Sequence, residues 1–224
     1  MNTGRTLNMK HYQLIIFDLD GTILDTLEDL MVSLNVALQK NKLPERSLEE
    51  VRSFVGNGIG MLIRRAVPAD ADEKMIRQVH TDFTDHYKDH SADHTRPYEG
   101  IPGLMKQLHE NGHHVAVVSN KADYAVQDLC RHYFPGLIDI AVGEKEGVRR
   151  KPEPDSVNEV IRLSGVSKES VVYIGDSEVD IRTAKNAGID AIIVEWGFRD
   201  RDFLIEQGAS VLVKTPGELS ALLL

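Results

Sequence analysis

Two aspartates, Asp18 and Asp20, stand one residue apart at the end of a short apolar segment, Tyr12–Phe17. A carboxylate can attack phosphorus to form an aspartyl-phosphate, and a second carboxylate close by can protonate the leaving oxygen and then activate water. The same side chains could also cap a helix or bind water. The pair therefore indicates phosphoryl chemistry only if the chain supplies positive charge or a metal nearby.

Two further segments offer groups that could bind a phosphate. Ser119 and Asn120 end the apolar segment that begins at His114, and their hydroxyl and amide could bind phosphate oxygens, although both residue types are common in loops. Lys151 precedes Pro152 and could neutralise a phosphoryl group and its nucleophile. A lysine before a helix is more often exposed to solvent, so neither segment is a strong signal alone.

Asp176 and Asp180 form the fourth candidate segment. Asp176 follows the apolar segment 171–174, and Asp180 lies four residues later, on the first turn of an expected helix. Their carboxylates could converge on one cation, and oxygen ligands of this kind suit Mg²⁺. A structural role as a helix N-cap, for Asp176 or for Ser177, is the alternative.

Short apolar segments alternate with segments of helical spacing over most of the chain. Nearly continuous apolar runs are typical of strands that are buried on both faces of a parallel sheet. Such runs occupy 12–17, 114–119, 138–142, 171–174, 191–194 and 210–213. The alternation predicts an α/β fold, a Rossmann-like three-layer sandwich with a parallel sheet at its core.

Residues 26–95 interrupt this alternation. Apolar residues recur there at intervals of three and four, in runs over 27–38, 51–63 and 73–89, and no segment has the character of a buried strand. We expect an all-helical cap domain over 26–95, inserted after the first strand. The α/β catalytic core would then comprise residues 1–25 and 96–224.

The composition limits the partners and the setting. The formal net charge is -9, which argues against nucleic acid or an anionic membrane as a partner. The single cysteine, Cys130, has no partner for an intrachain disulfide, and no apolar stretch approaches the length of a membrane span. Residues 1–10 lack the apolar core of a signal peptide. We therefore expect a cytoplasmic protein, a monomer or a homodimer, that binds a small phosphoester.

Together and in this order, the four segments resemble the motifs of the haloacid dehalogenase superfamily. The most specific are Phe17-Asp18-Leu19-Asp20-Gly21-Thr22 and Gly175-Asp176-Ser177 with Asp180, and the resemblance extends from Phe17 to about Leu219. It implies a magnesium-dependent hydrolase whose helical insert is the cap of that superfamily.

The resemblance also implies a role for each residue. Asp18 would be the nucleophile and Asp20 the general acid and base. Ser119 and Asn120 would hold the phosphoryl group, and Lys151 would stabilise its charge.

For the metal, the resemblance implies three ligands. Mg²⁺ would be bound by the Asp18 side chain, the Asp20 backbone carbonyl and Asp176, with Asp180 in support. The metal and a lysine would balance carboxylates that otherwise repel each other and the substrate.

The segment from Phe54 to Gly60 is similar to the cap segment of phosphoglycolate phosphatases within the superfamily. Gly56, Asn57, Gly58 and Arg64 are accordingly the candidates for substrate specificity, and 2-phosphoglycolate is the first candidate substrate. Pyrophosphate, sugar phosphates and pyridoxal phosphate stay open. A β-phosphoglucomutase activity is less favoured, because sugar phosphomutases usually carry a histidine twelve residues after the nucleophile, where this chain has Leu30.

Other classes of function fit less well. A catalytically silent phospho-ligand-binding protein would not require Asp20, and receiver domains phosphorylate an aspartate that ends a later strand. The glycines at 56, 58 and 60 lack the spacing of a dinucleotide-binding fingerprint. His86, His90 and His94 recur at intervals of four, and we interpret them as a solvated helix face rather than a metal site.

Overall fold

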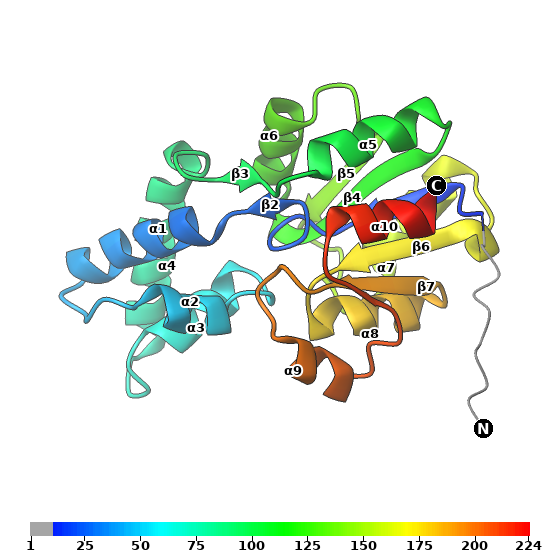
Figure 1. The fold of residues 1–224 in the computed structure, drawn as a ribbon. Coiled ribbons are helices and arrows are strands. Elements are labelled where there is room, and N and C mark those ends of the chain that lie inside the picture. The colour runs from blue at the N-terminus through cyan, green and yellow to red at the C-terminus, as the bar shows by residue number, and fades with distance from the viewer. Residues whose placement is uncertain (1–10) are drawn as a thin grey trace.

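A six-stranded parallel sheet forms the centre of the protein in a computed structural model that describes residues 11–224 (Figure 1). The strands follow the order β5-β4-β1-β6-β7-β8, and every neighbouring pair is parallel. They are β1 (Leu14–Phe17), β4 (His114–Ala122), β5 (Ile140–Glu144), β6 (Val171–Gly175), β7 (Asp190–Val194) and β8 (Leu212–Val213).

Helices cover both faces of the sheet, because the strands are apolar on both faces. Ile15 and Phe17 point to the face covered by α5 (Ile101–Glu110), α6 (Asp123–Tyr133) and α10 (Pro216–Leu223). Leu14 and Ile16 point to the opposite face, covered by α7 (Asp155–Ser164) and α8 (Glu178–Ala187). The predicted three-layer α/β fold is thus confirmed. The short helices η1 (Lys168–Ser170) and α9 (Arg201–Glu206) lie in connections.

Four helices follow β1 and pack around a hydrophobic cluster of their own. They are α1 (Leu27–Lys40), α2 (Leu48–Phe54), α3 (Ile59–Ala66) and α4 (Glu73–Asp89). The apolar run over 51–63 forms two helices instead of one, because Gly56 and Gly58, both at positive φ, break it. We refer to these four helices as the cap.

A two-stranded antiparallel ribbon connects the cap to the rest of the chain (Figure 1). It pairs β2 (Leu24–Asp25) with β3 (Arg96–Pro97), through Leu24 opposite Pro97 and Asp25 opposite Arg96. The two chain segments that enter and leave the cap therefore run side by side. The domain boundaries at 25/26 and 95/96 stay a prediction.

The strand order puts the end of β1 at a crevice. After β1 the chain adds β4 and β5 on one side, and it then returns to the other side of β1 for β6, β7 and β8. In open α/β sheets, ligands bind at this kind of switch point, beyond the carboxyl ends of the strands. Asp18 directly follows β1 and therefore stands at this switch point.

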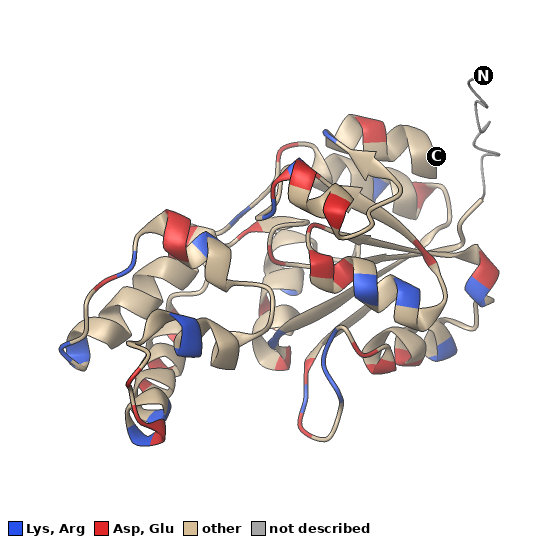
Figure 2. Ribbon diagram, turned by 90° about the horizontal axis from the view of Figure 1, so that it is seen from below, with Lys and Arg blue, Asp and Glu red and all other residues tan. Residues whose placement is uncertain are grey.

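Charged residues of both signs are distributed over the described part of the chain. Figure 2 shows acidic and basic positions interspersed along the ribbons on one side of the molecule. Cys130 is buried in the core beside Val126 and Phe134. Within residues 11–224, no helix has both the length and the apolarity needed to cross a membrane.

Candidate active site

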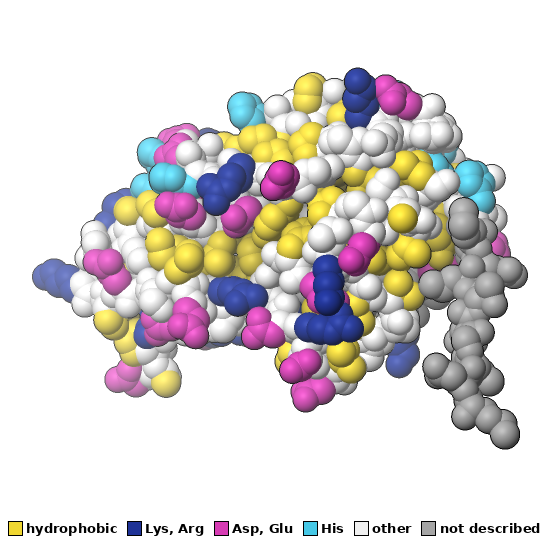
Figure 3. Space-filling model, in the orientation of Figure 1, with side chains coloured by type: hydrophobic (Ala, Val, Ile, Leu, Met, Phe, Trp, Pro, Cys, Tyr) yellow, Lys and Arg dark blue, Asp and Glu magenta, His cyan; other side chains and the backbone are white. Residues whose placement is uncertain are grey.

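A cavity lies between the carboxyl ends of the strands and the cap. Figure 3 shows hydrophobic side chains gathered on the face where the cap meets the sheet domain. Polar residues from the strand ends and apolar residues from the cap line the cavity. They are Asp18, Asp20, Leu30, Val55, Gly56, Gly58, Ile59, Leu62, Tyr87, Ser119, Asn120, Lys121, Lys151, Asp176, Ser177, Phe198 and Arg199.

Lys151 holds the centre of the polar wall. Its Nζ lies 2.9 Å from Asp18 Oδ1, 2.9 Å from Asp180 Oδ1 and 2.9 Å from the Tyr173 hydroxyl. The Tyr173 hydroxyl in turn donates to the Val118 carbonyl over 3.1 Å. Lys151 is buried, which excludes the alternative that this lysine is only a solvent-exposed residue before a helix. Its three N–H donors match three oxygens that are fixed by two neighbouring strands and a helix.

Asp180 supports this arrangement from the first turn of α8. Its Oδ2 accepts from the backbone N–H groups of Asp176 and Ser177 and from the Ser177 hydroxyl, over 3.2, 3.1 and 2.6 Å. Ser177 and Asp180 form a capping box, which satisfies the free N–H groups at the start of the helix. Both oxygens of Asp180 are therefore occupied by protein donors.

Asp176 is held from the opposite side. Its Oδ2 accepts from the Phe198 backbone N–H over 2.7 Å. Gly21, at φ +82°, and Gly197 pack against this carboxylate so closely that a Cβ on either would lie 2.4 Å from Asp176 Oδ2. Glycine at both positions thus leaves room for the carboxylate.

The carboxylates carry unbalanced negative charge. Burial raises the pKa of Asp18 to about 7; Lys151 lowers it, whereas Asp180 and Asp20 raise it further. Burial, followed by repulsion from Asp180 and Asp18, raises the pKa of Asp176 well above its usual range. The neighbouring carboxylates outweigh burial at Lys151 and raise the pKa of its ammonium. The charge of Lys151 alone does not neutralise the buried carboxylates, whereas an additional bound metal cation would.

The residues present fit a divalent cation. Oxygens of Asp18, Asp176 and Asp180 all lie within 4.8 Å of one another. Within residues 11–224, Asp18 Oδ2 and Asp176 Oδ1 accept no hydrogen bond, so each carboxylate keeps one oxygen for a metal. An all-oxygen donor set suits Mg²⁺. The ligand role of the Asp20 backbone carbonyl stays a prediction.

Asp20 lies on the cap side of Asp18 and pairs with a second buried lysine. Its Oδ1 accepts from Lys121 Nζ over 2.9 Å and from the Thr26 hydroxyl over 2.7 Å. The two aspartates of the first motif therefore have separate cationic partners, Lys151 for Asp18 and Lys121 for Asp20.

Ser119 and Asn120 differ in what they offer a ligand. Strand β4 continues to Ala122, beyond the expected end at Ser119, and both residues line the cavity. The Ser119 hydroxyl accepts weakly from the Lys121 N–H over 3.3 Å and can still donate to a ligand. The Asn120 amide nitrogen donates to the carbonyls of Lys151 and Gly56, over 3.1 and 3.3 Å, so it ties the cap to the strand end.

Of the four cap candidates, Gly56 and Gly58 line the cavity. The Asn57 side chain accepts from Arg65 over 2.9 Å, and the Asn57 carbonyl accepts from Arg150 over 3.3 Å. A Cβ on Gly58, where φ is +79°, would lie 2.9 Å from Arg150 Nη1. This loop therefore rests directly on the sheet domain.

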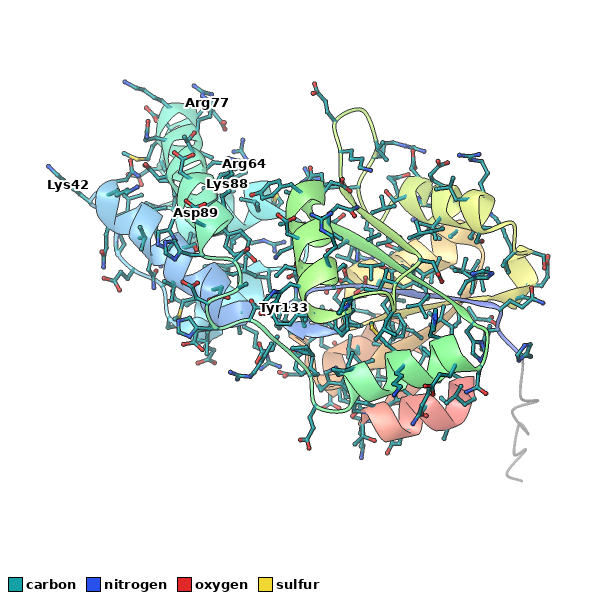
Figure 4. The ribbon with its side chains drawn as sticks, turned by 90° about the horizontal axis from the view of Figure 1, so that it is seen from above. Lys42, Arg64, Arg77, Lys88, Asp89 and Tyr133 are labelled. Atoms are coloured by element: carbon teal, nitrogen blue, oxygen red, sulfur yellow. The ribbon has the colours of Figure 1, made fainter. Side chains whose placement is uncertain are left out.

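Arg64 lies away from the cavity. Its guanidinium pairs with both carboxylate oxygens of Glu73, over 2.8 and 2.9 Å, and its side chain is 48% exposed. Figure 4 shows Arg64 on the cap with Lys88 and Asp89 of α4. The next residue, Arg65, faces inward, and its guanidinium binds the Phe54 carbonyl and Asn57.

Arg199 joins the sheet domain to the cap. Its guanidinium donates to the carbonyls of Arg52 and Val55 at the end of α2, over 3.1 and 2.8 Å, and to Glu178 over 2.9 Å. Arg52 reaches back to Asp200 over 3.1 Å at the surface. These contacts hold the cap over the cavity.

Three cavity residues received no role from the sequence. Tyr87 lies in the apolar helical run expected over 73–89, and no candidate segment of the sequence included Lys121 or Arg199. The signal for Lys121 was its position directly after Ser119 and Asn120 on an apolar strand.

Comparison with known proteins places this arrangement in a family. The family described as haloacid dehalogenase-like hydrolase matches residues 15–194. A phosphoglycolate phosphatase from Mesorhizobium japonicum is 34% identical over 197 residues, which cover 84% of this chain and 85% of the relative. A phosphoglycolate phosphatase from Aliivibrio fischeri is 30% identical over 193 residues, or 83% of this chain and 85% of the relative.

A solved structure agrees over nearly the whole chain. It is that of a candidate phosphoglycolate phosphatase from Lactobacillus delbrueckii subsp. bulgaricus, with a TM-score of 0.92 and 40% identity. The match covers 95% of this chain and 99% of the other. The cap and the sheet domain are therefore both shared with that protein.

Proposed function

Because this chain belongs to the haloacid dehalogenase-like hydrolase family and is a phosphatase of its phosphoglycolate phosphatase-like branch, we propose that it hydrolyses 2-phosphoglycolate with Mg²⁺ as cofactor. The observation that carries the mechanism is the pairing of two cavity carboxylates with two different buried lysines. Such an arrangement allows one carboxylate to act as nucleophile and the other as acid and base.

In the first step, the Asp18 carboxylate attacks phosphorus. The bond from Asp18 to phosphorus forms as the ester P–O bond breaks, and Asp20 gives its proton to the leaving alcohol. Lys151, 2.9 Å from Asp18, orients the nucleophile and faces the charge of the phosphoryl group. The Ser119 hydroxyl donates to a phosphoryl oxygen.

In the second step, water attacks the phosphorus of the aspartyl-phosphate. Asp20 accepts a proton from this water, and the products are inorganic phosphate and the free Asp18 carboxylate. Asp18 and Asp176 would hold the metal, with Asp180 positioning Lys151 and the loop of Asp176. Bound Mg²⁺ supplies charge neutralisation for the incoming phosphate and for the transition state.

Hydrolysis is favoured over a mutase reaction by the residue at position 30. Leu30 lines the cavity where a sugar phosphomutase would carry a histidine, and an alkyl side chain cannot exchange protons with a sugar hydroxyl. The names of the two curated relatives support 2-phosphoglycolate as the substrate.

Phosphate release from a panel of phosphoesters tests the proposal. The panel contains 2-phosphoglycolate, pyrophosphate, a hexose phosphate and pyridoxal phosphate, each with Mg²⁺ and with EDTA. We expect magnesium-dependent release that is fastest for 2-phosphoglycolate, and a loss of at least about 10³-fold in Asp18→Asn, as for removal of a nucleophile. Near-normal turnover by Asp18→Asn would refute the mechanism, and a faster member of the panel would replace the substrate.

The setting of the reaction is part of the proposal. We propose that the protein acts in the cytoplasm on a small molecule, as a monomer or a homodimer. The buried, free Cys130 is compatible with a reducing compartment.

A further inference from the structure

Two buried residues of the cavity, Lys121 and Tyr87, make no contact with the substrate in the mechanism above. Lys121 Nζ lies 4.7 Å from the centre of the Tyr87 ring, and the two residues belong to the sheet domain and the cap, respectively. The Tyr87 residue is 1% exposed, and in the described part of the chain its hydroxyl faces Lys121 but makes no hydrogen bond of good geometry. A buried hydroxyl without a good hydrogen bond is costly, so it points to a ligand.

The cations on the cavity wall are not equally available. Lys151 uses its donors on Asp18, Asp180 and Tyr173. Arg199 uses its guanidinium on Glu178 and on two carbonyls of the cap.

Lys121, in contrast, keeps spare donors. It donates to one carboxylate oxygen, that of Asp20 at 2.9 Å. Because an ammonium group has three donors, Lys121 can bind a second anion while it keeps its contact with Asp20.

The position of Lys121 connects it with the leaving group. A general acid must lie within about 2.6–3.2 Å of the oxygen that it protonates. Lys121 touches the acid, Asp20, so it lies within a few atoms of the ester oxygen. The cap supplies apolar walls around this point, from Leu30, Ile59 and Leu62. A carboxylate buried there needs a cation and a hydroxyl donor.

We propose that Lys121 and Tyr87 form the subsite for a carboxylate on the leaving group, and that they select phosphoesters whose carboxylate lies close to the ester oxygen. This inference rests on the proposed function and specifies its substrate class, the phosphorylated 2-hydroxy acids. The ammonium group binds the carboxylate from the floor of the cavity. Tyr87 donates a second hydrogen bond from the cap, so the contact forms only when the cap covers the site.

A pair of substrates isolates this subsite. 2-Phosphoglycolate and ethyl phosphate have the same two-carbon skeleton, but only the first carries a carboxylate. The quantity measured is the ratio of their kcat/KM values with Mg²⁺, in the full-length protein and in Lys121→Met, Tyr87→Phe and Tyr133→Phe. Tyr133 is the control, because its hydroxyl binds the Thr95 carbonyl and it does not line the cavity.

We expect the wild-type ratio to favour 2-phosphoglycolate strongly. Lys121→Met should reduce the ratio at least about 30-fold, as expected for loss of a charge-assisted contact, and Tyr87→Phe about 3- to 10-fold. Tyr133→Phe should leave it unchanged. Loss of Asp20 positioning alone would slow both substrates equally, so an unchanged ratio in Lys121→Met would overturn the subsite. If Lys121→Met does not fold, Tyr87→Phe, which removes only one oxygen, provides the test. An unchanged kcat/KM ratio in that variant would then overturn the subsite.

The test also separates this subsite from the proposed substrate. If wild-type protein prefers another phosphorylated 2-hydroxy acid, such as 2-phospholactate, and the preference still depends on Lys121, the subsite stands and 2-phosphoglycolate falls. If wild-type protein hydrolyses ethyl phosphate as well as 2-phosphoglycolate, the subsite is refuted while the phosphatase mechanism is untouched.

Discussion

Replacement of Arg199 by methionine should weaken closure of the cap without touching the reacting atoms. The Arg199 side chain is 12% exposed, and its guanidinium binds the carbonyls of Arg52 and Val55 at the end of α2. Methionine keeps much of the length of the side chain and removes the charge and all of the donors. The carbonyls of Arg52 and Val55 then lose the hydrogen bonds that they accept from Arg199 when the cap is closed, so the closed form is destabilised.

The size of the effect follows from these two hydrogen bonds. A hydrogen bond to a charged group contributes about 1.5–3 kcal/mol. Because water can reach the carbonyls after the substitution, we take the lower value for each bond and expect a loss of about 3 kcal/mol. At about 1.4 kcal/mol per tenfold change, the population of the closed state falls about 100-fold relative to the open state. Since turnover requires the closed state, kcat/KM should fall between about 10- and 100-fold.

Steady-state phosphate release with saturating Mg²⁺ measures this loss, and Arg52→Met serves as the control. Arg52 also bridges the cap and the sheet domain, but its partner Asp200 has a side chain that is 82% exposed. An exposed pair contributes about 0–1 kcal/mol, so Arg52→Met should cost less than about 5-fold. Equal losses in the two variants, or an Arg199→Met enzyme within about 3-fold of wild type, would refute the assignment of Arg199 as the cap contact that matters.

Three further outcomes are expected. Tyr173→Phe removes the hydroxyl that binds Lys151 and the Val118 carbonyl, so urea denaturation should show a loss of about 1–3 kcal/mol; an unchanged midpoint would contradict the buried network. Gly58→Ala forces a Cβ to within 2.9 Å of Arg150 at a φ of +79°, so KM should rise and the free energy of unfolding should fall by about 1–2 kcal/mol, and an unchanged KM would show that the loop has room. With EDTA present, Asp18 has a pKa of about 7 in the folded protein and of about 4 in the unfolded chain, so between these pH values only the folded protein holds this proton. Stability should therefore fall as pH rises from about 4 to about 7, and less steeply in Asp18→Asn; parallel curves for the two proteins would argue against the raised pKa.

The sequence was sufficient for the sheet and for the polar strand ends. Continuous apolar segments such as Leu14–Phe17 can be buried only between two helical layers, and polar residues directly after them must lie at one edge of a parallel sheet. The same reasoning brings Asp18, Ser119 and Asp176 together at that edge, and all three line the cavity.

The orientation of single side chains was beyond the same reasoning. Arg64 and Arg65 are adjacent on α3, and one residue on a helix turns the side chain by about 100°. A choice between them requires knowing which side of α3 meets the loop of Asn57. Burial of Lys121 was equally hidden, because a lysine is stable in the interior only beside a carboxylate, and its partner Asp20 lies about a hundred positions away in the chain.

Phe198 belongs to both halves of the molecule at once. Its backbone N–H fixes Asp176, and its side chain packs within the hydrophobic cluster of the cap. If a cation bound at Asp176 stabilises the closed cap relative to the open cap, closure of the cap must strengthen cation binding by the same free energy. Titrations of metal alone and of metal with a bound phosphate analogue should therefore give different affinities, and Phe198→Ala should bring the two values together.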